Sequence, residues 1–228
     1  MPRANAARST TLRQRPTTTL SRGRIVAEAV ALVDATGLDG LSMRRLAQRL
    51  GVDPMSLYNH VGDKEDLLDA MADAVVAEVD IPARTGPWAA DLRETILAAR
   101  AAMLRHPWAA QVLEGRRQPG PATMRYMDTV MDVLRGGGLS LELTHHAIHL
   151  LGSRILGFSQ DLFEDKAADR PDSAATAAAF AGFAETHPRV FEMAMAASHE
   201  GGVGGCDDDT EFAFALDLIL DGLARRAS

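Results

Sequence analysis

The side chains best suited to chemistry are gathered in the stretch LSMRRLAQRLGVDPMSLYNHVGDKEDLLD, residues 41–69. Its second half offers hydroxyl, amide and imidazole groups, which can hydrogen-bond to base edges or phosphates. Arginines and a lysine beside them supply the positive charge that binds a phosphate backbone. The outward-facing residues are Pro54, Met55, Ser56, Tyr58, Asn59 and His60, and the cations are Arg44, Arg45, Arg49 and Lys64. This combination points to nucleic-acid recognition.

Two short helices must hold these side chains in place. Ser42 is a favourable N-cap for a helix that ends before Gly51, and Asp53 is a favourable N-cap for a second helix that ends at Gly62. Two short helices joined by a tight turn with glycine form a helix-turn-helix, whose second helix enters the major groove. The alternative is a plain helical segment with a solvated polar face. A preceding helix at 21–36 and the local basic charge favour the helix-turn-helix.

The charge of the chain is distributed very unevenly. The whole chain has a formal net charge of −7. Residues 1–64, however, carry ten Lys and Arg against five Asp and Glu, a net of +5, and residues 65–228 carry fourteen against twenty-six, a net of −12. Because negative charges repel phosphates, only residues 1–64 are suited to binding DNA.

The first twenty residues are polar and contain four arginines but no acidic residue. We predict a flexible arm over 1–20, carrying Arg3, Arg8, Arg13 and Arg15. Such an arm can enter the minor groove beside the recognition site, as in some DNA-binding domains. It can equally be a tail without a role, and both interpretations stay open.

The expected fold class is all-α. Long segments show apolar residues at the helical period, and no convincing run alternates as a strand does. We expect helices at about 21–36, 42–50, 53–62, 63–80, 87–105, 107–115, 121–135, 140–164, 174–199 (with a break at Pro188) and 209–226. No apolar run is long enough to span a membrane, and Cys206 is the only cysteine, so we expect no membrane partner and a reducing, cytoplasmic setting.

The stretch TGLDGLSMRRLAQRLGVDPMSLYNHVGDKEDLLDAM resembles the N-terminal DNA-binding domain of TetR-family transcriptional regulators, over about residues 20–79. A weaker resemblance continues in DLRETILAARAAMLRHPWAAQVLEG and FAFALDLILDGL, which look like the ligand-binding and dimerisation domain of the subgroup that includes the tetracycline repressors. The resemblance implies an arm at 1–20, a helix-turn-helix domain at 21–66, and a helical ligand-binding and dimerisation domain at 67–228.

The function implied is that of a dimeric transcriptional repressor, not an enzyme, with no cofactor. It would bind a palindromic double-stranded DNA operator and be released by a small-molecule effector that moves the helix at 63–80. The same fold could serve an activator or a regulator without an inducer. A small-molecule carrier or enzyme with an incidental helix-turn-helix is the alternative from another class, but the chain has no Gly-x-Ser-x-Gly, P-loop or His-Glu-x-x-His motif.

The resemblance also assigns roles to single residues. Ser42 and Lys64 look like phosphate contacts at helix N-termini, and Arg44 matches an arginine that reads a guanine. Ser56, Tyr58 and His60 match contacts of the recognition helix to phosphate and bases. Asn59 departs from the aromatic residue common at its position, and Pro54 and Met55 differ from the tetracycline repressor. The operator sequence therefore stays open.

An effector cavity is expected among the helices at 87–164. The candidate lining residues are Met103, Trp108, Leu113, Met127, His149 and Phe158, with His146 and Arg154 as possible partners of a polar ligand group. Apolar residues at helical spacing can equally form an ordinary core. By resemblance, Leu113 stands where the tetracycline repressors have a metal-ligating histidine, and a second histidine aligns near Asp80. We therefore expect a more apolar effector than tetracycline–magnesium.

His145 and His149 lie four residues apart, a spacing that can bind a metal, but no further ligand set accompanies them. Polar surface or pocket-lining histidines are expected, and no metal site.

The last two helices are expected to form the dimer interface, because alanine allows close helix packing and phenylalanine and leucine fill the seam. The candidate interface residues are Phe180, Phe183, Phe191, Phe212, Leu216, Ile219, Leu220 and Leu223. The alternative is a bundle that packs only within one chain.

Overall fold

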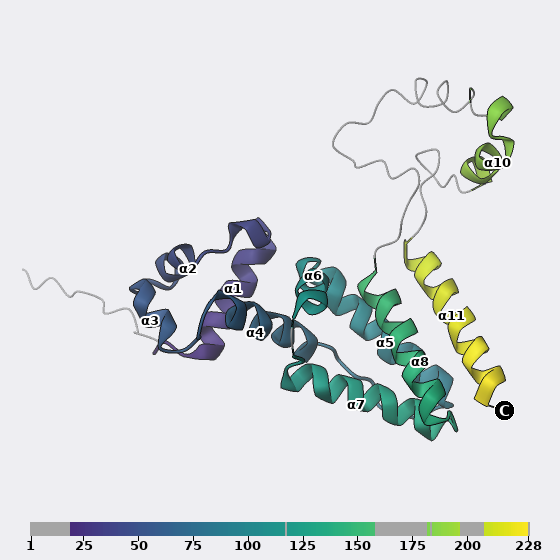
Figure 1. Ribbon diagram of the computed structural model, residues 1–228, viewed down its shortest axis with the longest axis horizontal. Helices are drawn as coiled ribbons and strands as arrows, with labels where there is room; N and C mark the ends of the chain where they lie inside the picture. Colours follow the sequence, from purple (N-terminus) through teal and green to yellow (C-terminus); the bar gives the residue numbers. More distant parts are fainter. Residues whose placement is uncertain (1–18, 117, 158–181, 183, 197–207, 228) are drawn as a thin grey trace, which may run out of the picture. The chain divides into compact units, whose positions relative to one another are not determined.

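The computed structural model describes residues 19–116, 118–157, 182, 184–196 and 208–227. Every regular element in these ranges is a helix (Figure 1), so the all-α prediction is confirmed. The chain divides into two compact units, residues 1–71 and 72–228. None of the helices described is both long and apolar enough to cross a membrane.

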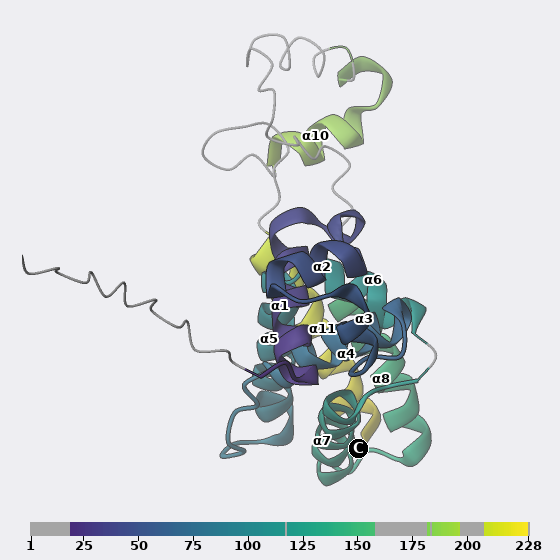
Figure 2. The same cartoon turned by 90° about the vertical axis from the view of Figure 1, so that its left-hand side faces the viewer.

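The first unit packs three helices and the start of a fourth around one small core. These are α1 (Arg22–Thr36), a 3₁₀ turn η1 (Leu38–Gly40), α2 (Met43–Leu50), α3 (Pro54–Tyr58) and the first residues of α4 (Lys64–Ala77). Figure 2 faces this unit and shows α2 and α3 next to each other. The largest fully buried side chains are Ile25, Leu32, Leu46, Leu57, Leu67 and Met71.

The turn between α2 and α3 follows from local capping. The Ser42 hydroxyl accepts a hydrogen bond from the Arg45 backbone N–H, and Asp53 accepts one from the Met55 N–H at 2.9 Å. Gly51 has φ 69°, in the left-handed region that glycine adopts without a steric penalty. These contacts fix where α2 ends and α3 begins, as the sequence predicted.

The predicted end of the second short helix at Gly62 is wrong, because α3 ends at Tyr58. The carbonyl of His60 accepts a hydrogen bond from Arg22 at 2.9 Å, and the N–H of Gly62 donates to Asp66 at 2.8 Å. These side chains take up backbone groups that a longer helix would use, and the chain turns towards α4 instead.

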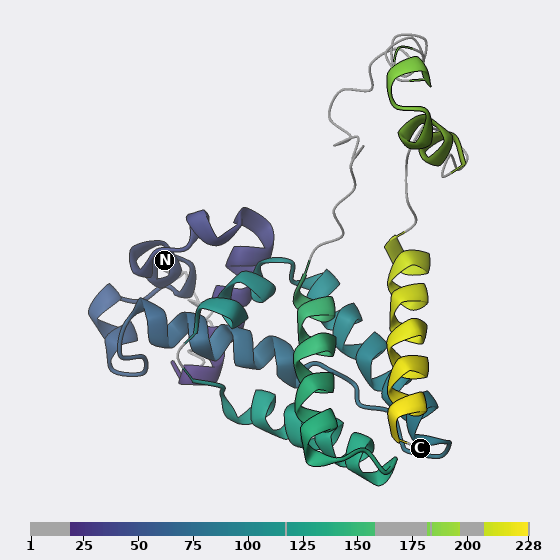
Figure 3. The ribbon, with the colours of Figure 1, turned by 45° about the vertical axis from the view of Figure 1, so that its right-hand side comes forward.

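The second unit is built on α5 (Trp88–Arg105), α6 (Trp108–Gly115), α7 (Pro121–Gly136), α8 (Leu141–Leu156) and α11 (Asp208–Ala227), together with the rest of α4. A further helix, α10, covers Pro188–Ala196 and starts at the proline where a break was expected. The helix expected at 140–164 ends at Leu156, and the residues after 157 lie outside the described part of the chain. Figure 3 shows α8 and α11 side by side and antiparallel.

The core of the second unit lies between α5, α7, α8 and α11. Four of the residues predicted for the dimer interface are buried in this core of a single chain: Phe212, Leu216, Leu220 and Leu223. Ile219 is partly buried against the same core. Their spacing places them on the stripe of α11 that packs on α5 and α8.

Candidate functional site

The candidate recognition surface is the outer side of α3. Met55 is 69% exposed and Tyr58 is 43% exposed, while Leu57 between them is fully buried and anchors the helix. Asn59 is exposed, and Pro54, Ser56 and His60 are partly exposed. The burial of Leu57 thus turns the predicted contact residues outward. Tyr58 combines a half-covered ring with a phenol hydroxyl that can reach a phosphate or a base.

The basic residues around α3 are not equivalent. Arg44 and Lys64 are exposed and form no ion pair with any residue in the described ranges. Arg45 donates to the carbonyl of Gly40 at 3.3 Å, whereas Arg49 donates to Glu28 at 2.5 Å and is held in an ion pair. Arg44 and Lys64 are therefore the cations best placed to neutralise phosphates. Ser42 accepts a cap bond, which leaves its hydroxyl proton to donate elsewhere.

A clamp holds the corner that follows α3. Arg22 donates to both carboxylate oxygens of Asp66, at 2.8 and 2.6 Å, as well as to His60. The hydrogen bonds from Arg22 and from the Gly62 N–H lower the pKa of Asp66 to about 2. The clamp joins α1, the turn after α3 and α4, and it fixes how α3 is presented. No sequence motif indicated it.

Arg3, Arg8, Arg13 and Arg15 lie outside the described residues, so the proposed role of the arm is untested.

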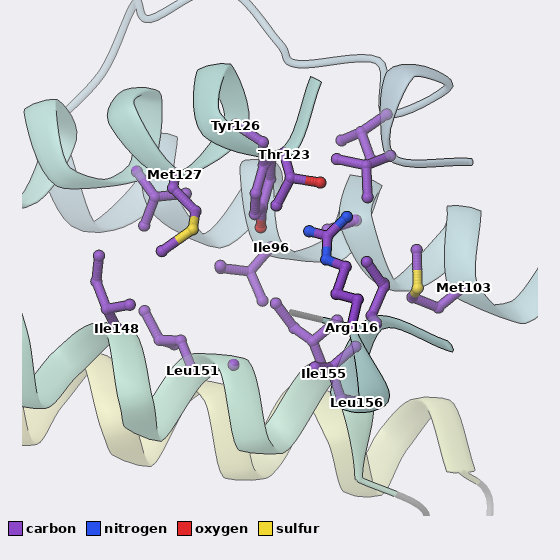
Figure 4. A pocket seen from close by; sticks show the side chains of 16 residues that line it. Ile96, Met103, Arg116, Thr123, Tyr126, Met127, Ile148, Leu151, Ile155 and Leu156 are labelled. Atoms are coloured by element: carbon purple, nitrogen blue, oxygen red, sulfur yellow. The ribbon is translucent and has the colours of Figure 1, made fainter. Parts of the chain in front are cut away.

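The second unit contains an apolar cavity of about 260 Å³, which Figure 4 shows from close by. It lies among α4, α5, α7 and α8. Its lining residues are Val76, Val79, Ile96, Ala99, Met103, Leu113, Arg116, Thr123, Tyr126, Met127, Val130, Ile148, Leu151, Gly152, Ile155 and Leu156. A concave, mostly apolar space with a few polar groups is the usual form of a small-molecule site.

Only Met103, Leu113 and Met127 of the predicted ligand residues line this cavity. Trp108 is buried nearby with its ring edge-on to His106, and Phe158 lies outside the described residues. The other three are on different faces of α8. His146 and His149 are exposed, and Arg154 lines a second, smaller cavity, where its guanidinium lies 5.0 Å from the centre of the Phe212 ring.

The rotation of α8 explains these differences. Ile148, Leu151 and Ile155, spaced three and four residues apart, face the cavity, so the histidines face away. The ring of His145 lies edge-on to that of His149, with 4.7 Å between ring centres. The same periodicity on α7 brings Thr123, Tyr126 and Val130 to the cavity. The helical spacing of these residues is visible in the sequence. It does not indicate which of several apolar stripes lines a cavity.

Asp73 of α4 and Glu78, just after its end, tie this part of the chain to its neighbours in the second unit. Asp73 accepts hydrogen bonds from the backbone N–H groups of Ala122 and Thr123, at 3.0 and 2.9 Å, and from the Thr123 hydroxyl. Partial burial would raise the pKa of Asp73, but these bonds and the nearby Arg116 lower it overall. Glu78 lies 3.1 Å from the His106 ring nitrogen and accepts from Arg105 at 3.3 Å.

The outer faces of α8 and α11 form a separate apolar surface. Leu150 is 47% exposed, Phe214 61% and Leu218 55%. A groove between the two helices is lined by Leu143, His146, Ala147, Leu150, Leu218, Ile219, Gly222, Leu223 and Arg226. Several exposed apolar side chains gathered on one face are typical of a protein interface.

Comparison with known proteins identifies both units. Residues 25–71 match the family "Bacterial regulatory proteins, tetR family", and residues 82–227 match "Tetracyclin repressor-like, C-terminal domain". The chain belongs to the TetR family. It is therefore a non-enzymatic helix-turn-helix transcriptional repressor with a ligand-binding domain, as the resemblance implied.

Several relatives cover most of the chain. The transcriptional repressor DrrR1 of Streptomyces coeruleorubidus is 34% identical over 91% of this chain and 78% of its own length. The class D tetracycline repressor of Escherichia coli is 34% identical over 67% of this chain and 72% of its own. The structure of Streptomyces coelicolor ActR in complex with actinorhodin is 33% identical, covers 92% of this chain and 99% of that chain, and has a TM-score of 0.73.

Proposed function

We propose that this TetR-family protein acts in the cytoplasm as a homodimer that binds a palindromic operator and is released by an apolar effector. The observation that carries the proposal is the apolar cavity lined by Val76 of α4 and by Val79 just after its end. The helix α4 follows the helix-turn-helix directly in the sequence. A molecule that fills the cavity therefore acts on the helix that connects the cavity to the DNA-binding region.

The proposed DNA contacts divide into two kinds. Ser42 and Lys64, each next to a helix N-terminus, contact phosphates and position the protein. Arg44, Tyr58 and His60, with Ser56 and Asn59, reach base edges or the backbone from α2 and α3. Pro54 and Met55 lie at the start of α3 and offer apolar contacts, which suit a thymine methyl group.

The proposed dimer uses the outer faces of α8 and α11. Its central residues are Leu150, Phe214 and Leu218, and of the predicted residues Ile219 and Leu223 line the groove beside them. A two-fold axis between copies is also what a palindromic operator requires. Phe191 of α10 is partly exposed and stays a candidate contact, while Phe180 and Phe183 lie outside the described residues.

The proposed effector is apolar and is not tetracycline–magnesium. Of the cavity-lining residues only Arg116, Thr123 and Tyr126 carry polar side chains, and none of the sixteen is a histidine or a carboxylate that would bind magnesium. The complexes of ActR with actinorhodin and with (S)-DNPA make these two molecules the first to test. Asp73 and Glu78 would transmit a displacement of α4 to α7 and to the junction of α5 and α6.

Release from DNA requires that the effector bind the released state of the protein much more tightly than the DNA-binding state. To move a population from 1:99 to 99:1, the effector must bind the released state more tightly by about 5.5 kcal/mol. An activator, or a regulator without an inducer, would use the same DNA-binding surface and differ only in this step.

Operator binding is tested by fluorescence anisotropy with the intergenic DNA beside the protein's own gene, across a salt series. Wild type is expected to bind tightly, with an affinity that falls steeply as salt rises. Arg44→Ala and Tyr58→Ala should abolish specific binding, whereas Arg125→Ala on α7 should change little. Wild type that binds this DNA no better than random DNA, with and without prior removal of bound ligand, would contradict the proposal.

Effector release is tested by adding actinorhodin, (S)-DNPA or tetracycline with Mg²⁺ to the complex with DNA. Release by the first two, but not by tetracycline, is expected. Binding of a ligand that leaves the affinity for DNA untouched would favour a carrier, and release by tetracycline–magnesium would refute the apolar effector.

The dimer is tested by analytical ultracentrifugation of Leu218→Glu. This variant should sediment as a monomer, because the substitution places a charge in an apolar seam. Met124→Glu is the matched control, since Met124 is 54% exposed but lies on α7. If Leu218→Glu remains dimeric, the interface lies elsewhere.

A further inference from the structure

We propose that the Tyr126 hydroxyl donates a hydrogen bond to an oxygen atom of the effector, so that the cavity selects apolar molecules bearing a carbonyl or similar acceptor oxygen. This inference rests on the proposed effector cavity and names the chemistry it would recognise. The placement of one polar atom in an apolar space carries it.

Tyr126 reaches the cavity from α7. Figure 4 shows its ring extending towards Ile96, with the hydroxyl at the inner end. The hydroxyl oxygen is buried and has no hydrogen-bond partner among the described residues. Buried hydroxyls in proteins are almost always hydrogen-bonded, so an orphaned one at a cavity wall indicates a group that a ligand completes.

The hydroxyl is a donor at every physiological pH. Burial raises the pKa of Tyr126 well above its usual value, so the phenol stays protonated. A neutral phenol can donate one hydrogen bond and accept others. The neighbouring groups therefore decide whether the site favours a donor or an acceptor on the ligand.

The other polar groups of the cavity also favour an acceptor. Arg116 can only donate hydrogen bonds, and the Thr123 hydroxyl gives its proton to Asp73 at 3.0 Å. The sixteen lining residues include no carboxylate side chain. A ligand amine or ammonium would therefore find little to bind, whereas a carbonyl oxygen meets a donor at Tyr126 and positive charge at Arg116.

The expected effect on ligand affinity follows from the free-energy cost of leaving a buried hydroxyl without a hydrogen-bond partner. A ligand that supplies the acceptor should bind roughly 10- to 100-fold more tightly than the same shape without it, since one partner of a buried hydrogen bond would otherwise be left unsatisfied.

The test compares 9-fluorenone with fluorene, two tricyclic molecules that differ by a ketone in place of a methylene. Their affinities are measured by isothermal titration against the full-length protein without DNA. Wild type should prefer fluorenone, and Tyr126→Phe should lose that preference while keeping its affinity for fluorene. Tyr58→Phe is the matched control, because it removes the chain's other phenol hydroxyl, outside the cavity.

A spectroscopic measurement separates a direct contact from a change in packing. In the bound complexes, the infrared stretch of fluorenone labelled with ¹³C at the carbonyl should lie at lower frequency in wild type and in Tyr58→Phe than in Tyr126→Phe. Equal affinity of wild type for the two probes, no binding of fluorenone, or the same carbonyl shift in Tyr126→Phe would overturn the proposal. Because no DNA is present, failure to bind an operator would refute the proposed function and leave this result unaffected.

Discussion

The side chain of Asp66 shows how one residue can organise a binding surface that it does not join. It accepts hydrogen bonds from Arg22 and from the Gly62 N–H, and its own N–H donates to Asp63 at the start of α4. Arg22 in turn holds the carbonyl of His60. The position of α3 thus depends on a carboxylate that stays ionised.

This dependence predicts a pH-sensitive contribution to stability. The pKa of Asp66 is lowered from 3.8 to about 2, so its contribution is fully present above pH 4 and is lost as the pH falls towards 2. Asp66→Asn should lower the unfolding free energy at pH 7 by about 1 kcal/mol, a figure already reduced for the solvent exposure of the pair. The difference from wild type should shrink below pH 4.

Thermal unfolding followed by circular dichroism at pH 7 and at pH 3 checks this, with Asp69→Asn as the control on the same helix. A deficit in Asp66→Asn that is equally large at both pH values would rule out the ion pair as its cause.

The helix α7 is held at both of its ends by residues of neighbouring elements. At its N-terminus Asp73 caps the first N–H groups, and a Cβ on Gly120 would lie 2.3 Å from the Asp73 carboxyl carbon. At its C-terminus a Cβ on Gly137 would lie 2.4 Å from the Trp88 ring, whereas one on Gly136 would meet nothing within 4 Å. Both ends of the helix are therefore closely packed against neighbours.

The two adjacent glycines predict opposite effects of the same substitution. Gly137→Ala should destabilise the protein by about 1–3 kcal/mol, because the ring of Trp88 must move. Gly136→Ala should be neutral or stabilising by up to about 1 kcal/mol, because alanine favours helix. Unfolding in urea, followed by circular dichroism, measures both, and equal effects would show that the clash is relieved at no cost.

In the molecule as a whole, the excess of positive charge and the excess of negative charge lie in different parts of the sequence. Residues 1–64 have a net charge of +5, and residues 65–228 have a net charge of −12. DNA is therefore attracted to one end of the sequence, and the acidic remainder opposes non-specific binding elsewhere. The four arginines of residues 1–15 are a large part of the positive charge.

Deleting residues 1–19 tests whether this charge reaches DNA. If the arm binds phosphates, the deletion should weaken operator binding and reduce the slope of log K against log salt by about 0.9 for each phosphate that the arm neutralises. Anisotropy titrations of the full-length and truncated proteins measure both quantities. An unchanged slope and affinity would show that the arm has no part in binding.

Local features of the sequence were enough for the helix-turn-helix. Ser42, Gly51 and Asp53 act on backbone groups within a few residues, so the start and end of α2 and the start of α3 followed from residue types alone. The end of α3 did not, because it depends on Arg22, which lies 38 residues from His60.

By itself, the sequence determined the helical class, the capped turn, the outward face of α3 and the membership of the TetR family. Only the tertiary structure decided which stripe of each amphipathic helix encloses space. It turned Ile148 and Ile155 to the cavity and His149 away from it, and it buried Phe212 while leaving Phe214 exposed. The reason is that a helical period shows that an apolar stripe exists, whereas the rotation of the helix is set by the neighbours that cover that stripe.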